Sequence, residues 1–143
     1  MTCHLLDVNV LIALAHGDHD DHGRAKAWFL REKARPWATC AFTEAGFVRV
    51  ISNPNYQDPS LDVVEARTML AALRRLPGHH FWRLDFPIED AIGPVASRFF
   101  GHQQVTDAYL LALAVRNHGK LATFDRGISF LAGEEFADQV VRV

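Results

Sequence analysis

The sequence predicts an α/β protein in which helices cover both faces of a mostly parallel sheet, a three-layer α/β/α sandwich. Short apolar runs alternate with longer amphipathic segments along the whole chain. This alternation is typical of βαβ units, whose crossover helices pack on the faces of the sheet. A chain of 143 residues is long enough for one domain with a substantial core, so we expect a single domain over residues 1–143.

Strands are predicted where a short apolar run stops at a turn or at a polar residue. The first covers residues 3–6, "CHLL", and stops at Asp7. A carboxylate buried alone is costly, so we expect Asp7 to lie beside a helix N-terminus or a cation. The remaining strands are residues 37–40 after Pro36, 80–84 ("HFWRL"), 120–124 ("KLATF", before Asp125) and 139–143 ("QVVRV").

Helices are predicted where apolar residues recur every three or four positions between residues that begin and end helices. The last of them, "TDAYLLALAVRNHG", is expected to end with Gly119 at the C′ position, after the helix cap. The earlier helices run from Val8 to near Gly17, from Asp20 or Asp21 onward, from Thr43 to about Ile51, from a cap at Ser60 to Pro77-Gly78, and from Pro87 to about Phe99.

Composition places the chain among ordinary soluble proteins, with 49% hydrophobic and 22% charged residues. No apolar stretch approaches the roughly 18 residues that span a bilayer, and the N-terminus shows no export signal. We therefore expect a cytoplasmic protein that does not enter a membrane. Cys3 and Cys40 are too few for a disulfide framework, and both are expected to be reduced and buried.

The formal net charge of −2 does not decide whether the chain binds nucleic acid. A negative protein repels phosphate, yet only three of the 15 basic residues are Lys, and Arg is suited to bidentate phosphate contacts. Acidic residues that bind divalent ions would also stop adding to the negative surface charge. Charge alone therefore excludes no partner.

Four acidic residues follow strands or begin helices at one edge of the predicted sheet: Asp7, Glu44, Asp107 and Asp125. Ligands of such sheets bind outside the carboxyl ends of the strands. Each acid also has a structural explanation as a helix cap, a first-turn acid or a turn residue. Together, however, four converging carboxylates would repel one another unless a cation lay among them. All-oxygen ligands suit Mg²⁺ or Mn²⁺.

Other features of the chain are assigned structural roles. The loop "HGDHDDH", residues 16–22, is interpreted as a solvated turn whose Asp residues cap the next helix rather than as a zinc site. Gly119-Lys120 lacks the Ser or Thr of a phosphate-binding loop, because Leu121 follows. The aromatic residues are expected in the core or in interfaces rather than as platforms for base stacking; they are Trp28, Phe29, Phe42, Phe47, Trp82, Phe86, Phe99 and Phe100.

The ordered segments "LLDVNVLIAL", "TEAGFVRVISNP", "TDAYLLALA" and "LATFDRGI" resemble the PIN domain, most closely the VapC-type toxins of bacterial toxin–antitoxin pairs. The resemblance covers essentially the whole chain. It implies a three-layer α/β/α fold and metal-dependent RNA cleavage, with the family's acids at Asp7, Glu44, Asp107 and Asp125. It also implies that Asn9 and Thr123 occupy polar positions flanking the site. A haloacid-dehalogenase-type phosphatase would need an acid where this chain has Asn9.

We therefore expect a Mg²⁺- or Mn²⁺-dependent endoribonuclease toxin that cleaves structured RNA, either tRNA or rRNA, by two-metal phosphodiester hydrolysis. Arg126 is the favoured RNA contact among the arginines. The resemblance also implies a small antitoxin protein as partner and a homodimer, which the apolar segments "AWFL" and "FVRVI" favour. Two alternatives stay open: a PIN-like nuclease acting on DNA, which would need more chain to clamp a duplex, and a non-enzymatic nucleotide- or RNA-binding module.

Overall fold

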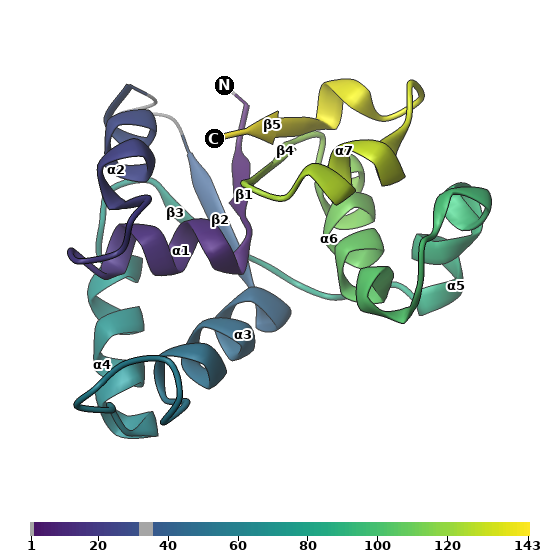
Figure 1. Ribbon diagram of the computed structural model, residues 1–143. Helices are drawn as coiled ribbons and strands as arrows, with labels where there is room; N and C mark the ends of the chain where they lie inside the picture. The colour runs from purple at the N-terminus through teal and green to yellow at the C-terminus, as the bar shows by residue number, and fades with distance from the viewer. Residues whose placement is uncertain (1, 32–35) are drawn as a thin grey trace.

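The computed structural model describes residues 2–31 and 36–143, and a parallel sheet runs through its centre (Figure 1). Its strands lie in the order β3-β2-β1-β4-β5, and every neighbouring pair is parallel. The first strand is thus central and pairs with the fourth, which is far from it in sequence. The strands are β1 (His4–Leu6), β2 (Trp37–Cys40), β3 (His79–Trp82), β4 (Lys120–Thr123) and β5 (Val140–Arg142).

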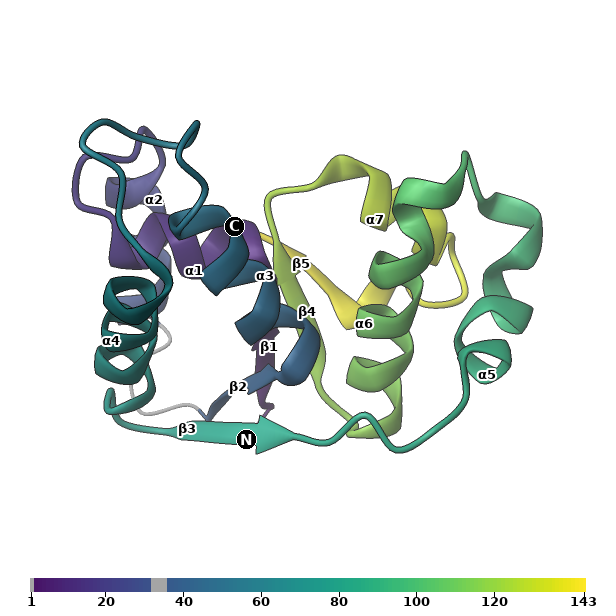
Figure 2. The ribbon, with the colours of Figure 1, turned by 90° about the horizontal axis from the view of Figure 1, so that it is seen from below.

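Helices cover both faces of this sheet, which confirms the predicted three-layer arrangement (Figures 1 and 2). One face carries α1 (Val8–Ala15), α2 (His22–Arg31), α3 (Ala41–Ile51) and α4 (Val63–Arg74). The other face carries α5 (Ile88–Ile92), α6 (Val105–Arg116) and α7 (Arg126–Ala132), with short 3₁₀ helices at Gly93–Arg98, His102–Gln104 and Ala137–Gln139.

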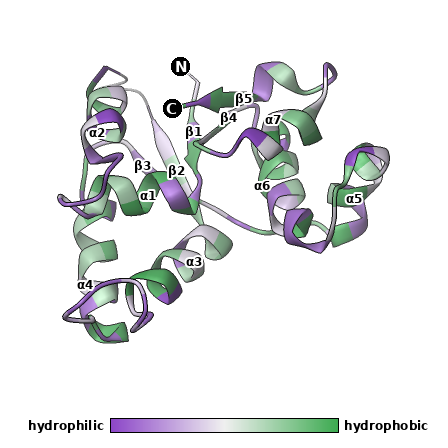
Figure 3. Ribbon diagram, in the orientation of Figure 1, coloured by the Kyte–Doolittle hydropathy of each residue, from purple (hydrophilic) through white to green (hydrophobic). Residues whose placement is uncertain are grey.

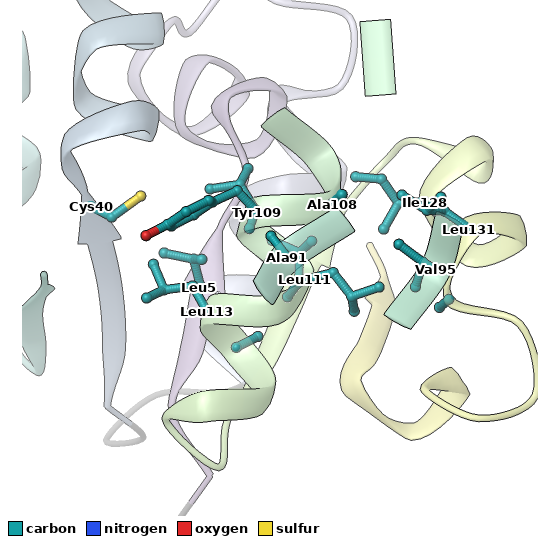
Figure 4. Packing of buried hydrophobic residues seen from close by; sticks show 14 of the residues in the cluster. Leu5, Cys40, Ala91, Val95, Ala108, Tyr109, Leu111, Leu113, Ile128 and Leu131 are labelled. Atoms are coloured by element: carbon teal, nitrogen blue, oxygen red, sulfur yellow. The ribbon is translucent and has the colours of Figure 1, made fainter. Parts of the chain in front are cut away.

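The alternation of side chains along β1 divides the core into two apolar clusters. Leu5 and Leu6 are both fully buried, and successive strand residues point to opposite faces. Leu5 packs in the cluster formed with α5, α6 and α7, which Figure 4 shows with Tyr109 and Leu113 beside it. Leu6 packs in the cluster formed with α1, α3 and α4. In agreement with this packing, α1 and α6 are mostly hydrophobic, and hydrophilic residues gather in the loops (Figure 3).

Two helix predictions need correction, and one helix of the structure was not predicted. The helix after Ser60 is capped by Asp62, whose carboxylate accepts from the Glu65 N–H at 2.8 Å while the Glu65 carboxylate accepts from the Asp62 N–H. The helix predicted from Pro87 to Phe99 stops at Ile92 and continues as a 3₁₀ helix, because Pro94 cannot donate a helical hydrogen bond. The helix α7 was not predicted at all.

The end of α6 also differs from its prediction. His118 rather than Gly119 takes the left-handed conformation, with φ 54°. The N–H groups of His118 and Gly119 donate to Val115 O and Ala114 O at 3.0 and 2.8 Å, the pattern of a Schellman motif. Gly119 is instead required by close packing, since an added Cβ would lie 2.5 Å from Cys3 O and 2.7 Å from the Trp82 ring.

Several predicted core residues are placed differently by the structure. Both cysteines are free, but Cys3 is only half-buried, and burial raises the pKa of its thiol to about 11. In "AWFL" and "FVRVI" the residues Trp28, Phe47 and Ile51 belong to the core, so these segments leave less apolar surface for partners than expected. Phe100 lies outside the core and is 73% exposed. Within the described ranges, no helix combines the length and apolarity needed to cross a membrane.

Candidate acidic active site

Asp7 lies at the carboxyl edge of the sheet because of the register between β1 and β4. Leu6 pairs with Ala122, so the next residues of the two strands, Asp7 and Thr123, are neighbours. The Asp7 N–H donates to Ala122 O at 3.0 Å, and the Thr123 hydroxyl donates to Asp7 Oδ2 at 2.7 Å. The other oxygen, Oδ1, accepts from the Val8 N–H at 2.8 Å. Asp7 is therefore both the cap of α1 and a buried acid at the sheet edge.

Thr123 also positions the second aspartate of this edge. Its hydroxyl oxygen accepts from the Asp125 N–H at 3.0 Å while its proton is donated to Asp7. Asp125 caps α7, since its Oδ1 accepts from the Gly127 N–H at 2.7 Å. The expected turn at Asp125-Gly127 is thus present, and it begins a helix that the sequence did not reveal.

Asp107 completes a set of three interacting aspartates from the first turn of α6. Burial, together with the negative charges of Asp7 and Asp125, raises the pKa of Asp107 to about 7. Burial also raises the pKa of Asp7, with a smaller contribution from Asp125, against the hydrogen bonds from Thr123 and Val8. The negative charge of Asp125 therefore disfavours the ionised forms of Asp7 and Asp107. We call Asp7, Asp107 and Asp125 the aspartate triad.

Glu44, the fourth predicted acid, interacts with a different set of groups. It lies in the first turn of α3, and its Oε2 accepts from the Thr39 hydroxyl at 2.6 Å. The guanidinium of Arg74 on α4 lies 3.5 Å from Oε1. Thr39 in turn lies 2.8 Å from His79 Nε2, and its proton is given to Glu44, so the imidazole is the donor in this contact. Glu44 is thus tied to β2, β3 and α4, and its place in the active site stays a prediction.

Asn9 and Arg126, which were predicted to flank the site or to contact RNA, lie near the ends of the segments that carry the triad. Asn9 Oδ1 accepts from the Phe124 N–H at 3.4 Å, which links α1 to the segment that follows β4. Arg126 is exposed at the first position of α7. In the loop "HGDHDDH" the imidazole nitrogens have separate partners: His16 contacts the Tyr56 hydroxyl, His19 accepts from the Asp21 N–H, and His22 contacts Ala13 O.

Sequence reasoning missed Gln104, which precedes α6. Its side chain is 9% exposed, and its Oε1 accepts from the Phe100 N–H at 2.6 Å. Its Nε2 lies 3.5 Å from Gly127 O, at the start of α7. The amide thus joins the segment before α6 to the helix that Asp125 caps. Nothing in its sequence position distinguishes it from the neighbouring Gln103, because only the fold buries one of the two.

The donor chemistry of the aspartate triad fits a divalent cation such as Mg²⁺. A cation would offset the burial and the carboxylate repulsion that together raise the pKa values of Asp7 and Asp107. In the part of the chain that the structure describes, no three acidic, histidine or cysteine side chains form a ready-made cage for a metal ion. Mg²⁺ does not require one, because it keeps several waters and is commonly held by one or two carboxylates together with substrate phosphate.

An apolar pocket of about 290 Å³ lies apart from the triad, between α5 and α6. It is lined mainly by Phe86, Val95, Leu111 and Val115, with Asp90 and Arg116 as its charged residues. None of the three aspartates contributes to it. A pocket with this lining offers neither the oxygen donors nor the converging charge of the triad, so we locate the candidate chemistry at the sheet edge.

The fold and the triad together define an α/β/α protein with an acidic centre at the carboxyl edge of a parallel sheet. The family model for the PIN domain matches residues 4–134. Ribonuclease VapC44 of Mycobacterium tuberculosis is 48% identical over 128 residues, a match that covers 90% of this chain and 89% of that protein. The chain therefore belongs to the PIN-domain family and, within it, to the VapC ribonucleases, as the resemblance predicted.

Solved structures agree with this fold at low sequence identity. VapC20 of Mycobacterium tuberculosis, a sarcin-ricin loop cleaving toxin, superposes with a TM-score of 0.65 at 15% identity, covering 90% of this chain and 93% of that one. VapBC2 of Rickettsia felis, bound to a DNA fragment from their promoter, gives a TM-score of 0.63 at 12% identity, covering 99% and 98%. At such identities the likeness concerns the fold alone.

Proposed function

We propose that this chain is a Mg²⁺-dependent endoribonuclease, with Mn²⁺ as a substitute ion, and the toxin of a toxin–antitoxin pair that acts on structured RNA in the cytoplasm. The proposal treats residues 1–143 as one nuclease domain. The observation that carries it is the mutual interaction of Asp7, Asp107 and Asp125, with the pKa of Asp107 raised to about 7. The names of the VapC relatives support ribonuclease activity.

The residues of the triad have distinct structural roles in this proposal. Asp7 is the least mobile ligand, because both of its oxygens already accept hydrogen bonds from Val8 and Thr123. Asp107 lies in the first turn of α6, and Asp125 is the cap of α7. A divalent ion bound there would neutralise phosphoryl oxygens and lower the pKa of a water molecule for attack on phosphorus. Thr123 keeps Asp7 and Asp125 in a fixed relation through its single hydroxyl.

Glu44 is proposed as a further acid of the site that contributes through water or through substrate contact. Its side chain is 16% exposed, so it is in contact with solvent, and the Arg74 guanidinium lies 3.5 Å from its Oε1. Asn9 and Arg126 are proposed to support the site, Asn9 by holding the segment after β4 and Arg126 by contacting RNA phosphate from the start of α7.

The proposed partners are a small antitoxin protein and a second copy of this chain. The resemblance to VapC toxins and the fold match to the VapBC2 assembly support the antitoxin. An arginine of the antitoxin entering the acidic centre would replace the charge of the metal ion. Mass measurement in solution and co-purification with the product of the adjacent gene test these partners; a monomer at high concentration that retains no small protein contradicts both.

The direct test of the nuclease is a substrate comparison. The purified chain is incubated with Mg²⁺ or Mn²⁺ and with total RNA or flap DNA, and an Asp7→Ala variant serves as control. We expect cleavage of RNA at one or a few sites, mapped by sequencing the new 5′ ends, and no cleavage by the control. Efficient cutting of the flap DNA with intact RNA would instead assign the chain to the DNA-acting nucleases.

A further inference from the structure

Two phenylalanine rings form an exposed stack that the fold itself does not need. Phe100 and Phe130 are 73% and 56% exposed, and their ring centroids are 4.6 Å apart with 29° between the ring planes. Phe100 lies between two 3₁₀ helices, and Phe130 lies on α7. Neither ring belongs to the two core clusters. A large apolar surface that stays in water is typical of an interaction site. We call these two residues the phenylalanine pair.

The phenylalanine pair is linked to the acidic centre through Gln104. The side-chain oxygen Oε1 of Gln104 accepts from the Phe100 N–H at 2.6 Å. The side-chain nitrogen Nε2 of Gln104 lies 3.5 Å from Gly127 O. The position that a Cβ would take on Gly127 is 3.1 Å from Asp125 Oδ1 and 3.5 Å from Gln104 Nε2. The Gln104 amide and the Asp125 carboxylate therefore both lie close to Gly127. The segment that carries Phe100 is thus joined through Gln104 to Gly127, two residues after Asp125 of the triad.

Arg126 carries a positive charge on the same face of α7 as the Phe130 ring. Arg126 and Phe130 are four residues apart, so they lie on one face of the helix, and both are exposed. Asp125, which belongs to the triad, immediately precedes Arg126. An aromatic surface, a cation and a carboxylate centre thus follow one another along α7. Proteins that bind single-stranded nucleic acid combine these features: cations contact the backbone, and aromatic rings stack on bases.

We propose that the phenylalanine pair stacks on an unpaired base of the RNA next to the cleaved phosphate, while Arg126 contacts the intervening backbone. This inference rests on the proposed ribonuclease function and names the feature of the substrate that the site would bind. A nucleobase fits the patch better than a protein does. Two rings offer a few hundred Å², whereas a stable protein interface needs about 800 Å² on each partner. Unpaired RNA bases are commonly recognised by such stacking.

The test separates base stacking from backbone binding in an inactive background. The Asp7→Asn variant, or Asp107→Asn if the first does not fold, is titrated with Mg²⁺ present. One probe is a fluorescein-labelled single-stranded RNA of about twelve nucleotides, and the second has the same backbone with abasic sites in its central part. Fluorescence anisotropy gives the two dissociation constants, and their ratio measures the contribution of the bases.

We expect the inactive protein to bind the base-bearing RNA about tenfold more tightly than the abasic RNA. Phe100→Ala and Phe130→Ala should remove most of this preference, and Phe100→Leu should fail to restore it although it keeps apolar volume. Phe100→Tyr should preserve it. Arg126→Ala should weaken binding of both RNAs by a similar factor. Leu30→Ala, which removes a comparably exposed apolar side chain from α2, should change neither constant.

Three results would overturn the inference. The first is equal affinity of the inactive protein for the base-bearing and the abasic RNA. The second is a full preference for the base-bearing RNA in Phe100→Leu. The third is a change in molar mass in solution on Phe100→Ala, which would assign the phenylalanine pair to an interface between copies of the chain. The proposed function is judged separately by RNA cleavage in the active protein. Cleavage without a base preference rejects the stacking alone, and a base preference without cleavage rejects the nuclease.

Discussion

The Thr123 hydroxyl connects two residues of the acidic centre at once: it donates to Asp7 Oδ2 at 2.7 Å and accepts from the Asp125 N–H at 3.0 Å. Thr123 is fully buried, so neither bond is exchanged for a bond to water without opening the structure. A single oxygen thereby sets the spacing between the end of β1 and the start of α7.

Replacing Thr123 by Val keeps the shape of the side chain and removes both hydrogen bonds. We expect the free energy of unfolding to fall by about 1–3 kcal/mol, because Asp7 Oδ2 and the Asp125 N–H lose their partner. RNA cleavage should fall as well, since the two carboxylates are no longer held in register. Thr123→Ser is the matched control and should retain most of both properties. Denaturant unfolding and initial cleavage rates measure the two effects; a Val variant as stable and active as the parent would contradict this role.

Removing the metal should abolish cleavage, and Asp7→Asn should do nearly the same while the protein stays folded. The Asn side chain can still accept from the Val8 N–H and so retain the cap of α1. Relief of repulsion among the carboxylates offsets part of any lost hydrogen bonding. Circular dichroism and thermal unfolding, beside a cleavage assay in excess EDTA, provide the measurements. Full activity in EDTA rejects the metal-dependent mechanism, whereas an unfolded Asp7→Asn variant assigns Asp7 to capping alone.

The stability of the metal-free protein should depend on pH through Asp107. Its pKa in the folded protein is about 7, above the ordinary 3.8, so the folded state prefers the protonated acid. The stabilisation from this group is complete below the unfolded value and is lost as the pH rises through the folded value. Asp107→Asn should therefore stabilise the metal-free protein increasingly between about pH 4 and pH 7, by on the order of 1–2 kcal/mol after allowance for solvent screening.

The measurement for Asp107 is urea unfolding of the two proteins in EDTA across this pH range. Addition of Mg²⁺ should reduce the advantage of the Asn variant, because the cation stabilises the ionised aspartates of the parent. Asp138→Asn, on a 3₁₀ helix outside the triad, serves as a control for a general loss of one negative charge. Equal pH profiles for the parent and Asp107→Asn would show that Asp107 is not perturbed.

A variant that removes the charge of Glu44 but keeps its hydrogen bond tests whether Glu44 serves the reaction or only the structure. Glu44→Gln keeps an acceptor for the Thr39 hydroxyl and removes the negative charge beside Arg74. If Glu44 serves the reaction, the rate constant for RNA cleavage falls by about 100-fold or more, in line with the loss of an electrostatic contributor to catalysis, with little change in stability. Arg74→Ala is the companion variant, because it removes the ion pair and leaves the carboxylate. A normal rate in Glu44→Gln limits Glu44 to structural contacts.

The layered fold could be predicted because its signal is local. The apolar runs of β1, β2 and β4 and the spacing in α3 and α6 were each visible within a few residues. The short helix α7 was missed, since it holds only the residues Arg126–Ala132 and begins within a segment that also fits a turn. Caps were misplaced where two candidates stood close together, as with Ser60 and Asp62, because only the three-dimensional path decides which one meets the free N–H groups.

The acidic centre was predictable in part for the same reason. Asp7 and Asp125 follow from the rule that parallel sheets bind ligands at their carboxyl edge, and Asp107 was expected as an acid at a helix N-terminus. In the structure the charges of Asp7 and Asp125 act on Asp107, while the role of the three as an active site stays a prediction. The contacts of Glu44 with Thr39 and Arg74 were not predictable, because they depend on how α3 and α4 pack against β2. The sequence allowed either the core or an interface for Phe100, and only the structure shows that its ring is exposed.

The pairing of β1 with β4 sets how late in its own synthesis this chain can assemble its acidic centre. Asp7 leaves the ribosome before its hydroxyl partner Thr123, which lies 116 residues later in the chain. At about 5–20 residues per second, several seconds separate the emergence of the two. A nascent or truncated chain that ends before β4 lacks both Thr123 and Asp125. The acidic centre can therefore be completed only after β1 to β4 have all been synthesised.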